Sequence, residues 1–287
     1  MDKTSLTLLV TVILIWSLNW SAMKIGLMFV DPLSFVMQRF ILASIVLLAI
    51  MPLKVKVFPR DRKTWLRLLI LSLINTTQIT LIHVGLMYEN SGLSSLVTYT
   101  QPLFVFCLAV PFLGEKASVI RVLGALTGFL GVVILYAEKI SLTMNLLNPI
   151  LFLIFGAFLW AVTIVYYKKF VSHVNPLLVN AVQLSMGFAF ISAVTLALRG
   201  NALEFNFSTQ YVSALLYSSI IGLAMGSTIW LILIRKEETI SVTTSSLIVP
   251  VVAAMFGWIL LGENISILSF LSFVLVLMGI YLVNRKT

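Results

Sequence analysis

Residues 102–115 read PLFVFCLAVPFLGE, and residues 250–263 read PVVAAMFGWILLGE. In each stretch a proline is followed eleven residues later by Leu-Gly-Glu, and the two copies lie 148 residues apart (250 − 102). A glycine stands 18 residues after each Leu, at Gly131 and Gly279. A second set repeats at an offset of 144 residues and comprises Trp16 and Trp160, Lys24 and Lys168, and Pro32 and Pro176. This self-similarity predicts a duplicated unit, with one copy in residues 5–137 and the other in residues 149–283.

The composition predicts a protein embedded in a membrane. Hydrophobic residues make up 60% of the 287 residues and charged residues 10%, whereas a soluble domain carries about 25% charged residues. The net charge of +9 comes from Lys and Arg scattered through short loops, which favours a role in membrane orientation over binding of nucleic acid. The single cysteine, Cys107, excludes an intrachain disulfide and is either apolar filler or a thiol in a pocket.

The apolar segments predict an all-α integral membrane protein with ten transmembrane helices. A helix needs about 20 apolar residues to cross the hydrocarbon core. Polar breaks divide the chain into ten such segments, which are 5–26, 33–53, 66–87, 92–113, 118–137, 149–170, 177–198, 211–233, 240–261 and 266–283. Of the 19 Lys and Arg residues, 15 fall on the side that holds both termini, three fall on the other side, and Arg39 lies inside the second segment. This asymmetry predicts cytoplasmic termini in the cell membrane.

Each copy of the repeat therefore holds five spans. Because five is odd, the second copy enters the membrane upside down relative to the first. Inverted-topology repeats are a recurring plan of secondary transporters, in which the two halves can exchange conformations.

The doubled block of Pro, Leu-Gly-Glu and Gly resembles the drug/metabolite transporter superfamily, and within it the ten-helix EamA-type permeases. The block ends the fourth and ninth segments and crosses the fifth and tenth, and the resemblance covers nearly the whole chain. It implies export or exchange of small metabolites, often amino acids, through a central cavity. It does not supply a substrate.

Two prolines near the middle of the fourth and ninth segments predict broken helices. Pro102 and Pro250 lack an N–H, so the carbonyls of Thr98 and Ser246, four residues earlier, lose their helical partners. Freed backbone groups beside hydroxyls suit a cavity wall. The polar residues that we expect there are Thr98, Tyr99, Thr244 and Ser246. In the alternative, these are kinked packing helices whose Ser and Thr hydroxyls bond their own backbone.

Further candidates for the cavity wall come from polar and aromatic residues at mid-membrane depth. The third segment carries Asn75, Thr76, Thr77 and Gln78 in succession, and we select Gln78 as cavity-facing. Helical spacing places a second group on stripes of the first and sixth segments: Trp16, Asn19, Trp20 and Met23, and Trp160, Thr163 and Tyr167. The alternative for both groups is interhelical packing. Trp230, near the end of the eighth segment, reads as an interface anchor.

The charged residues add little to the predicted cavity. All ten acidic residues fall in loops or at span ends, which disfavours strong export of cations. Glu115 and Glu263 are expected to cap the helix that follows each of them, with a gating role as the alternative. We expect Lys24 and Arg39 to reach the headgroups, and His83 to be a hydrogen-bonded packing histidine rather than a proton relay. The GxxxG pairs Gly124/Gly128 and Gly222/Gly226 are read as helix-packing contacts.

The sequence shows no metal-binding spacing, no phosphate-binding glycine loop and no pair of intramembrane carboxylates. We therefore predict a transporter rather than an enzyme, with no cofactor. The remaining aromatic, amide and hydroxyl chemistry favours a small neutral or zwitterionic metabolite, such as an amino acid, moved outward by alternating access. The alternative is a membrane-embedded enzyme or assembly protein that binds a lipid in the same cavity. The expected partners are this solute and the lipid bilayer, without nucleic acid, and the oligomeric state is open.

Overall fold

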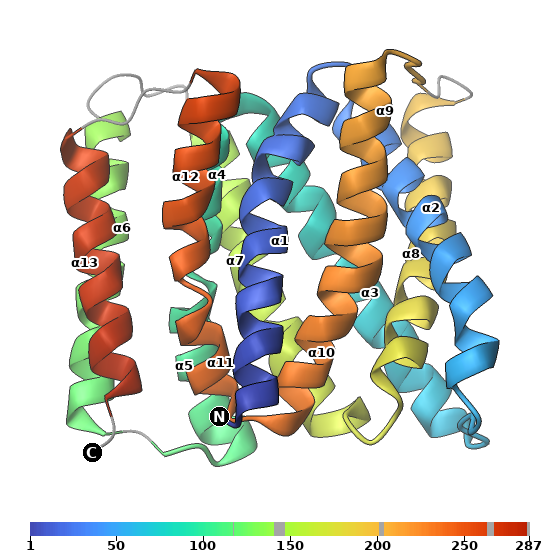
Figure 1. The fold of residues 1–287 in the computed structure, drawn as a ribbon, viewed down its shortest axis with the longest axis horizontal. Helices are drawn as coiled ribbons and strands as arrows, with labels where there is room; N and C mark the ends of the chain where they lie inside the picture. The colour runs from blue at the N-terminus through green and yellow to red at the C-terminus, as the bar shows by residue number, and fades with distance from the viewer. Residues whose placement is uncertain (117, 141–146, 201–203, 263–266, 286–287) are drawn as a thin grey trace.

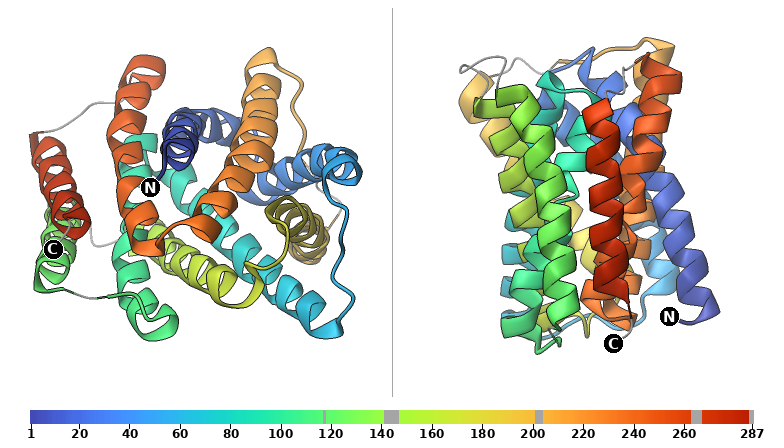
Figure 2. Two further views of the ribbon diagram at one scale, coloured as in Figure 1. Left: turned by 60° about the horizontal axis from the view of Figure 1, so that its bottom comes forward. Right: turned by 90° about the vertical axis from the view of Figure 1, so that its left-hand side faces the viewer.

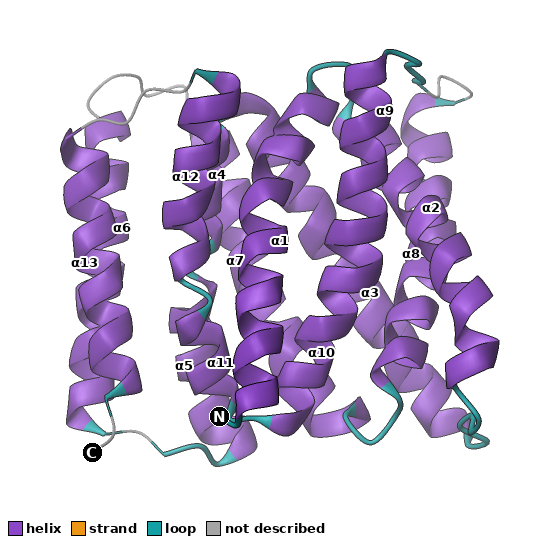
Figure 3. Ribbon diagram, viewed as in Figure 1, coloured by secondary structure: helices purple, strands orange, loops and turns teal. Residues whose placement is uncertain are grey.

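The computed structural model describes residues 1–287 except 117, 141–146, 201–203, 263–266 and 286–287. Within these residues every regular element is a helix and no strand occurs (Figure 3). The first half of the chain forms α1 (Lys3–Leu27), α2 (Pro32–Lys54), α3 (Arg62–Tyr88), α4 (Ser91–Thr98), α5 (Gln101–Leu113) and α6 (Val119–Ile140). The second half forms α7 (Leu147–Tyr166), η1 (Tyr167–Val171), α8 (Pro176–Arg199), α9 (Thr209–Leu216), η2 (Tyr217–Gly226), α10 (Ser227–Lys236), α11 (Thr239–Ser245), α12 (Ile248–Leu261) and α13 (Ile267–Asn284).

The prediction of an all-helical membrane protein is confirmed. Eight helical segments of the described chain are long and apolar enough to cross a membrane, and two shorter apolar helices cover Val119–Gly131 and Phe270–Val283. The helices stand side by side, and the start of α1 and the end of α13 lie at the same end of the bundle (Figure 1). The shorter pair, in α6 and α13, forms a separate column at one edge (Figure 2).

Helix starts at related positions of the two halves use the same chemistry. The Asp31 carboxylate accepts hydrogen bonds from the amides of Leu33 (2.9 Å) and Ser34 (3.3 Å), immediately before α2. Asn175, 144 residues later, accepts one from the amide of Leu177 (2.9 Å) before α8. A proline follows each cap, where its missing N–H costs the helix nothing. The local sequence thus fixes where these two helices begin.

Two of the predicted spans are each made of two shorter helices. A two-residue turn interrupts the α-helix at Tyr99 and Thr100, between α4 and α5, and at Ser246 and Leu247, between α11 and α12 (Figure 3). Pro102 and Pro250 lie in the first turns of α5 and α12. Both interruptions therefore occur at corresponding places in the two halves.

Two π-helical segments, which the sequence analysis did not predict, interrupt other spans. η1 follows α7, and the ten-residue η2 lies between α9 and α10. The wider turn of a π-helix alters the helical hydrogen-bond ladder and is common at functional sites. In η2 the carbonyls of Ser218 and Gly222 accept hydrogen bonds from the side chains of Arg39 (3.0 Å) and Trp16 (3.2 Å), respectively. This irregular segment therefore connects the second half to α1 and α2.

Corresponding elements of the two halves pack against each other. α2 contacts α8 and α6 contacts α13, while α4 on α12 is matched by α11 on α5, and α1 on α12 is matched by α7 on α5. α6 and α13 approach each other closely, because a Cβ added to Gly124 would come within 2.6 Å of the Gly279 carbonyl oxygen. The predicted packing role of the Gly124/Gly128 pair agrees with this contact.

Two lysines related by the repeat close the ends of neighbouring helices. Each ammonium group donates to three backbone carbonyls: Lys24 to Leu86 (3.0 Å), Met87 (3.0 Å) and Glu89 (2.7 Å), and Lys168 to Ile234 (2.6 Å), Arg235 (3.2 Å) and Glu237 (2.9 Å). A cation at a helix C-terminus satisfies carbonyls that have no helical partner and complements the helix dipole. The Lys24 ammonium is therefore held by the end of α3.

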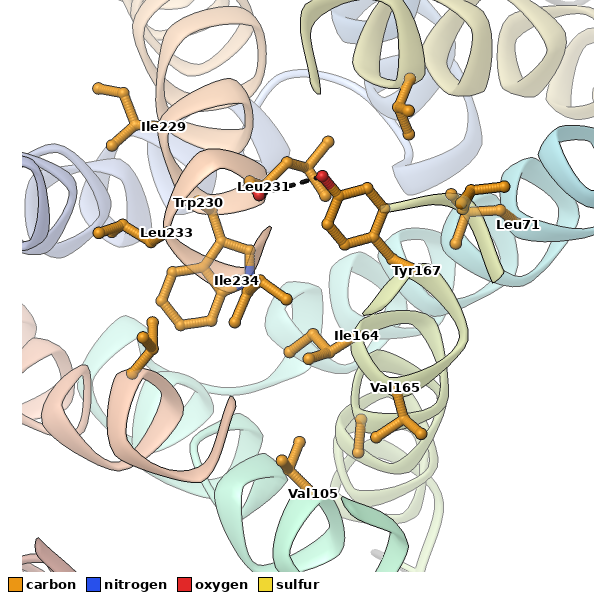
Figure 4. Packing of buried hydrophobic residues seen from close by; sticks show 14 of the residues in the cluster. Leu71, Val105, Ile164, Val165, Tyr167, Ile229, Trp230, Leu231, Leu233 and Ile234 are labelled. Carbon is orange, nitrogen blue, oxygen red and sulfur yellow. Dashed lines mark hydrogen bonds between the residues drawn. The ribbon is translucent and has the colours of Figure 1, made fainter. Parts of the chain in front are cut away.

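The largest buried apolar cluster lies where both halves meet, and Figure 4 shows part of it. The fully buried Tyr167 of η1 donates its hydroxyl to the Leu231 carbonyl of α10 (3.1 Å). Trp230 and Ile234 of α10 point into the same space, with Ile164 of α7 across from them. The side chains of this cluster also form part of the wall of a cavity.

Candidate functional site

A cavity with a volume of about 110 Å³ lies within the helical bundle. Side chains from both halves line it, and they come from α1, α2, α3, the junction of α4 and α5, α7, η1, α8, η2 and α10. Ten residues predicted from the sequence are in this wall: Trp16, Asn19, Trp20, Met23, Gln78, Thr98, Tyr99, Trp160, Thr163 and Tyr167. The duplicated stripes of α1 and α7 therefore meet at one site.

Aromatic rings from three helices and one helix break form one side of the wall. Trp16 of α1 lies edge-on to Trp160 of α7, with ring centroids 5.5 Å apart, and 5.1 Å from Trp230 of α10. Tyr99, at the break between α4 and α5, lies edge-on to Trp160 at 5.5 Å. Such arrangements are favourable contacts between rings. The Trp16 indole N–H is held by the Gly222 carbonyl (3.2 Å), which fixes the ring in the wall.

Buried polar atoms without a protein partner form another part of the wall. Within the described chain, these atoms include Asn19 Oδ1, Asn75 Nδ2, Gln78 Oε1, Thr98 Oγ1, Tyr99 Oη and Gln183 Oε1. Buried polar groups in proteins are almost always hydrogen-bonded, because a buried polar group without a hydrogen bond costs about 1–3 kcal/mol. This concentration around one cavity indicates that the groups bond to what the cavity contains.

Arg39 of α2 is the most unusual residue of the wall, because its side chain is only 1% exposed. Its guanidinium donates to Nε2 of His83 on α3, to Met23 Sδ (3.3 Å) and to the Ser218 carbonyl (3.0 Å). The expectation that Arg39 reaches the headgroups is wrong, because these three contacts hold it inside the bundle. His83 is hydrogen-bonded, as expected, and it also lines the cavity.

Four of the residues selected from the sequence lie outside the wall. Thr244 donates its hydroxyl to the Ile240 carbonyl (2.6 Å), and Ser246 donates its hydroxyl to the Thr243 carbonyl (2.8 Å). These are bonds to their own helix, as in the packing alternative. Pro102 and Pro250 are buried in the first turns of α5 and α12 and are not in the wall either. The two breaks are thus unequal, since Thr98 and Tyr99 beside the first line the cavity.

Sequence reasoning missed or misplaced several residues of the wall. Trp230 was read as an interface anchor, but it is buried and packs on Trp16 and Trp160. Gln183 of α8 was not singled out, although a glutamine inside an apolar segment was a visible signal. Gly222 and Gly226 lie against α1, because added Cβ atoms would come within 2.5 Å of Asn19 Oδ1 and 2.7 Å of Trp16 Nε1, respectively. These glycines therefore shape the wall.

The glutamate of the first Leu-Gly-Glu joins the two halves. Glu115 accepts hydrogen bonds from the amides of Thr239 (2.9 Å) and Ile240 (3.0 Å), at the N-terminus of α11. We expected Glu115 to cap the helix that follows it in the chain. This prediction is wrong about which helix Glu115 caps. A carboxylate at a helix N-terminus satisfies free amides and complements the dipole. Glu263, the related residue, lies outside the described residues.

Cys107 is exposed on α5 and is not in the cavity wall, which agrees with its interpretation as apolar filler rather than a thiol in a pocket.

Comparison with known proteins shows one family covering almost the whole chain. The EamA-like transporter family matches residues 3–137 and again residues 147–285. An uncharacterized transporter of Bacillus subtilis (strain 168), YoaV, is 26% identical in an alignment of 283 positions that covers 96% of this chain and 94% of the relative. A probable amino-acid metabolite efflux pump of Escherichia coli (strain K12) is 26% identical in an alignment of 293 positions that covers 98% of this chain and 95% of the relative. A crystal structure with 18% identity superposes with a TM-score of 0.76 over 98% of this chain and 96% of its own, and so shares the fold.

Proposed function

Because this chain belongs to the EamA-like transporter family, we propose that it carries a small neutral or zwitterionic metabolite, such as an amino acid, out of the cell through the cavity described above. The observation that carries the proposal is the cavity wall itself, which joins aromatic rings to several buried polar atoms without protein partners. Such a wall suits a solute with both apolar and polar parts. The name of the Escherichia coli relative, an amino-acid metabolite efflux pump, supports the solute class and the direction.

We further propose that the chain crosses the membrane ten times, as two five-helix repeats of opposite orientation with both termini in the cytoplasm. Support comes from the start of α1 and the end of α13, which lie at the same end of the bundle (Figure 1), and from the distribution of Lys and Arg. The repeated family match and the related lysine contacts of Lys24 and Lys168 support equivalent roles for the two halves.

The architecture supports a proposal of alternating access. The breaks at Tyr99 and Ser246 divide two spans into half helices that can tilt separately, and the cavity lies between the repeats. Rocking of one repeat against the other would open the cavity to one side of the membrane and then to the other. Within the described residues no acidic side chain lines the wall, which supports a solute that is not strongly cationic.

Transport can be tested with the purified full-length protein in lipid vesicles. Vesicles are preloaded with a panel of radiolabelled amino acids and other small metabolites, and the loss of each solute is compared with that from protein-free vesicles. We expect at least one small zwitterionic or neutral solute to leave faster. A protein that moves no member of the panel but chemically alters an added lipid would support the lipid-binding alternative instead.

A further inference from the structure

Arg39 has a property that the proposed function does not use. A guanidinium stays protonated in proteins, and charged residues buried inside membrane-spanning segments are costly and mark substrate pathways or partners. Arg39 lies almost completely buried on α2, and it is among the residues that line the cavity. The structure therefore places a fixed positive charge in the wall, and the identity of its counter-ion becomes the question.

Every group that the structure brings to Arg39 is neutral. The guanidinium can only donate, so Nε2 of His83 has to accept, and Nδ1–H of the same ring donates to the Ile79 carbonyl (2.7 Å). This arrangement requires the uncharged form of His83. The Met23 sulfur and the Ser218 carbonyl carry no charge either, and the Phe35 ring lies 5.7 Å from the guanidinium. The Arg39 Nε has no partner in the described chain.

Among the described residues, no carboxylate neutralises this charge. Asp31 begins the same helix but stands eight residues earlier, about 12 Å along the axis, and pairs with Arg199 (3.2 Å). Removing one partner of a buried ion pair is strongly destabilising, because a charge is left uncompensated. The contacts around Arg39 orient its side chain but do not neutralise its positive charge. This is expected for a site in which the ligand supplies the counter-ion.

We propose that the transported solute carries a carboxylate, and that Arg39 binds this carboxylate in the cavity. The inference rests on the proposed transport function and narrows its substrate class. Guanidinium and carboxylate match in geometry and charge. The remaining amide groups of the wall, such as those of Asn75 and Gln183, provide neutral hydrogen bonds, and the Trp16 and Trp160 rings contact the apolar part of the solute.

A carboxylate fits this wall better than a phosphate does. Within the described residues Arg39 is the only Lys or Arg that lines the cavity. One guanidinium balances a monoanionic carboxylate, whereas a phosphate monoester near neutral pH carries about 1.5 to 2 negative charges and would leave part of its charge uncompensated in a buried site. The cavity is therefore expected to discriminate against phosphate esters.

The proposal is tested with probes in which the carboxylate is replaced and with probes in which it is kept but the amino group is missing. Purified full-length protein in detergent is titrated with leucine and phenylalanine, with their amides, with 4-methylpentanoate and 3-phenylpropanoate, and with phenyl phosphate. Binding is followed by tryptophan fluorescence, to which Trp16, Trp160 and Trp230 contribute, and by the melting temperature. We expect the carboxylates of at least one series to bind and the matching amide to bind at least tenfold more weakly. Amides that bind as well as the acids, or phenyl phosphate that binds better, would overturn the proposal, as would the absence of binding by every carboxylate.

Variants of Arg39 test the residue itself. Arg39→Gln is expected to lower the affinity for the carboxylate probes at least tenfold and to leave the weak binding of the amides unchanged. Arg39→Lys keeps the charge and is expected to lose less affinity for the carboxylate probes. Its affinity can be measured if Arg39→Gln does not fold. Arg60→Gln removes the same charge from an exposed loop and serves as the matched control. Equal carboxylate affinity in the wild type and a folded Arg39→Gln would overturn the proposal.

Vesicle assays separate this inference from the proposed function. If wild-type protein exports phenylalanine and phenylalaninamide equally, transport stands and the carboxylate role of Arg39 fails. If no solute moves although the carboxylates bind through Arg39, the inference stands and the transport proposal fails.

Discussion

Trp160 connects more parts of the cavity wall than any of the other aromatic residues described. Its ring contacts Trp16, Trp230 and Tyr99, which come from α1, α10 and the first helix break. Aromatic pairs contribute about 0.5–1.5 kcal/mol each beyond the apolar area that they bury. We predict that Trp160→Ala lowers solute flux at least tenfold. Flux per molecule of protein in the membrane is the measurement, since abundance is quantified in the same vesicles.

The matched control for this variant is Trp258→Ala on α12. Trp258 is 61% exposed within the protein and does not line the cavity, so its loss should leave flux close to the wild-type value. A similar decrease in both variants would mean that the effect comes from general loss of tryptophan rather than from the wall.

Thr98 and Ser246 occupy related positions of the two halves, 148 residues apart, but their hydroxyls have different surroundings. Thr98 Oγ1 has no partner in the described chain and lies in the cavity wall, whereas Ser246 bonds the Thr243 carbonyl. We predict that Thr98→Val raises the half-saturating solute concentration several-fold, because a net hydrogen bond is worth about 0.5–1.5 kcal/mol. Ser246→Ala should leave that concentration unchanged. The reverse ranking would show that the second break, not the first, contacts the solute.

Wall residues could be predicted from the sequence where their spacing along a single helix indicated a shared face. The stripes of Trp16, Asn19 and Trp20 and of Trp160 and Thr163 follow helical spacing, so they share a face before any tertiary structure is known. The predictions for Arg39 and Trp230 were wrong because the position of a residue along a helix does not determine the direction in which its side chain points. Arg39 stays inside because η2 offers it the Ser218 carbonyl, and a π-helix has no clear sequence signature here.

At the scale of elements, the contact between α6 and α13 depends on single glycines. A Cβ on Gly124 would lie 2.6 Å from the Gly279 carbonyl oxygen, whereas one on Gly128 would meet only a Leu103 methyl carbon at 3.7 Å. We predict that Gly124→Ala destabilises the protein by about 1–3 kcal/mol, the usual range for overpacking, and that Gly128→Ala is close to neutral. Melting temperatures of the two variants in the same detergent provide the measurement. Equal melting temperatures would show that the column rearranges without cost.

The helix breaks show how far local sequence reaches. Proline placed the interruptions in the right spans because the missing N–H acts within one turn. It could not indicate that only the first break supplies wall residues, since Thr244 and Ser246 found carbonyls on their own helix. Local sequence also could not identify the partner of Glu115, because α11 comes close to that glutamate only after the two halves have packed together.

For the whole molecule, duplication made the fold largely predictable. Offsets of 144 and 148 residues relate helix starts, breaks and lysine contacts, so one half of the sequence serves as a check on the other. The cavity is less symmetric than the scaffold, because Arg39 has no lysine or arginine at the related position of the second half, which is Gln183. A scaffold of two equivalent halves can thus hold a solute with unlike ends.

The proposed opposite orientation of the two repeats can be tested at Met28 and His173. Met28 follows α1, the first helix of the first half, and His173 follows η1 at nearly the related position of the second half; both are exposed. In a Cys107→Ser background, we predict that Met28→Cys reacts with a membrane-impermeant maleimide in intact cells. His173→Cys should react only after the cells are permeabilised, because inverted repeats place related positions on opposite sides of the membrane. Labelling of both from one side would contradict inverted repeats, whereas an exchange of the two patterns would keep the inversion and reverse the orientation inferred from Lys and Arg.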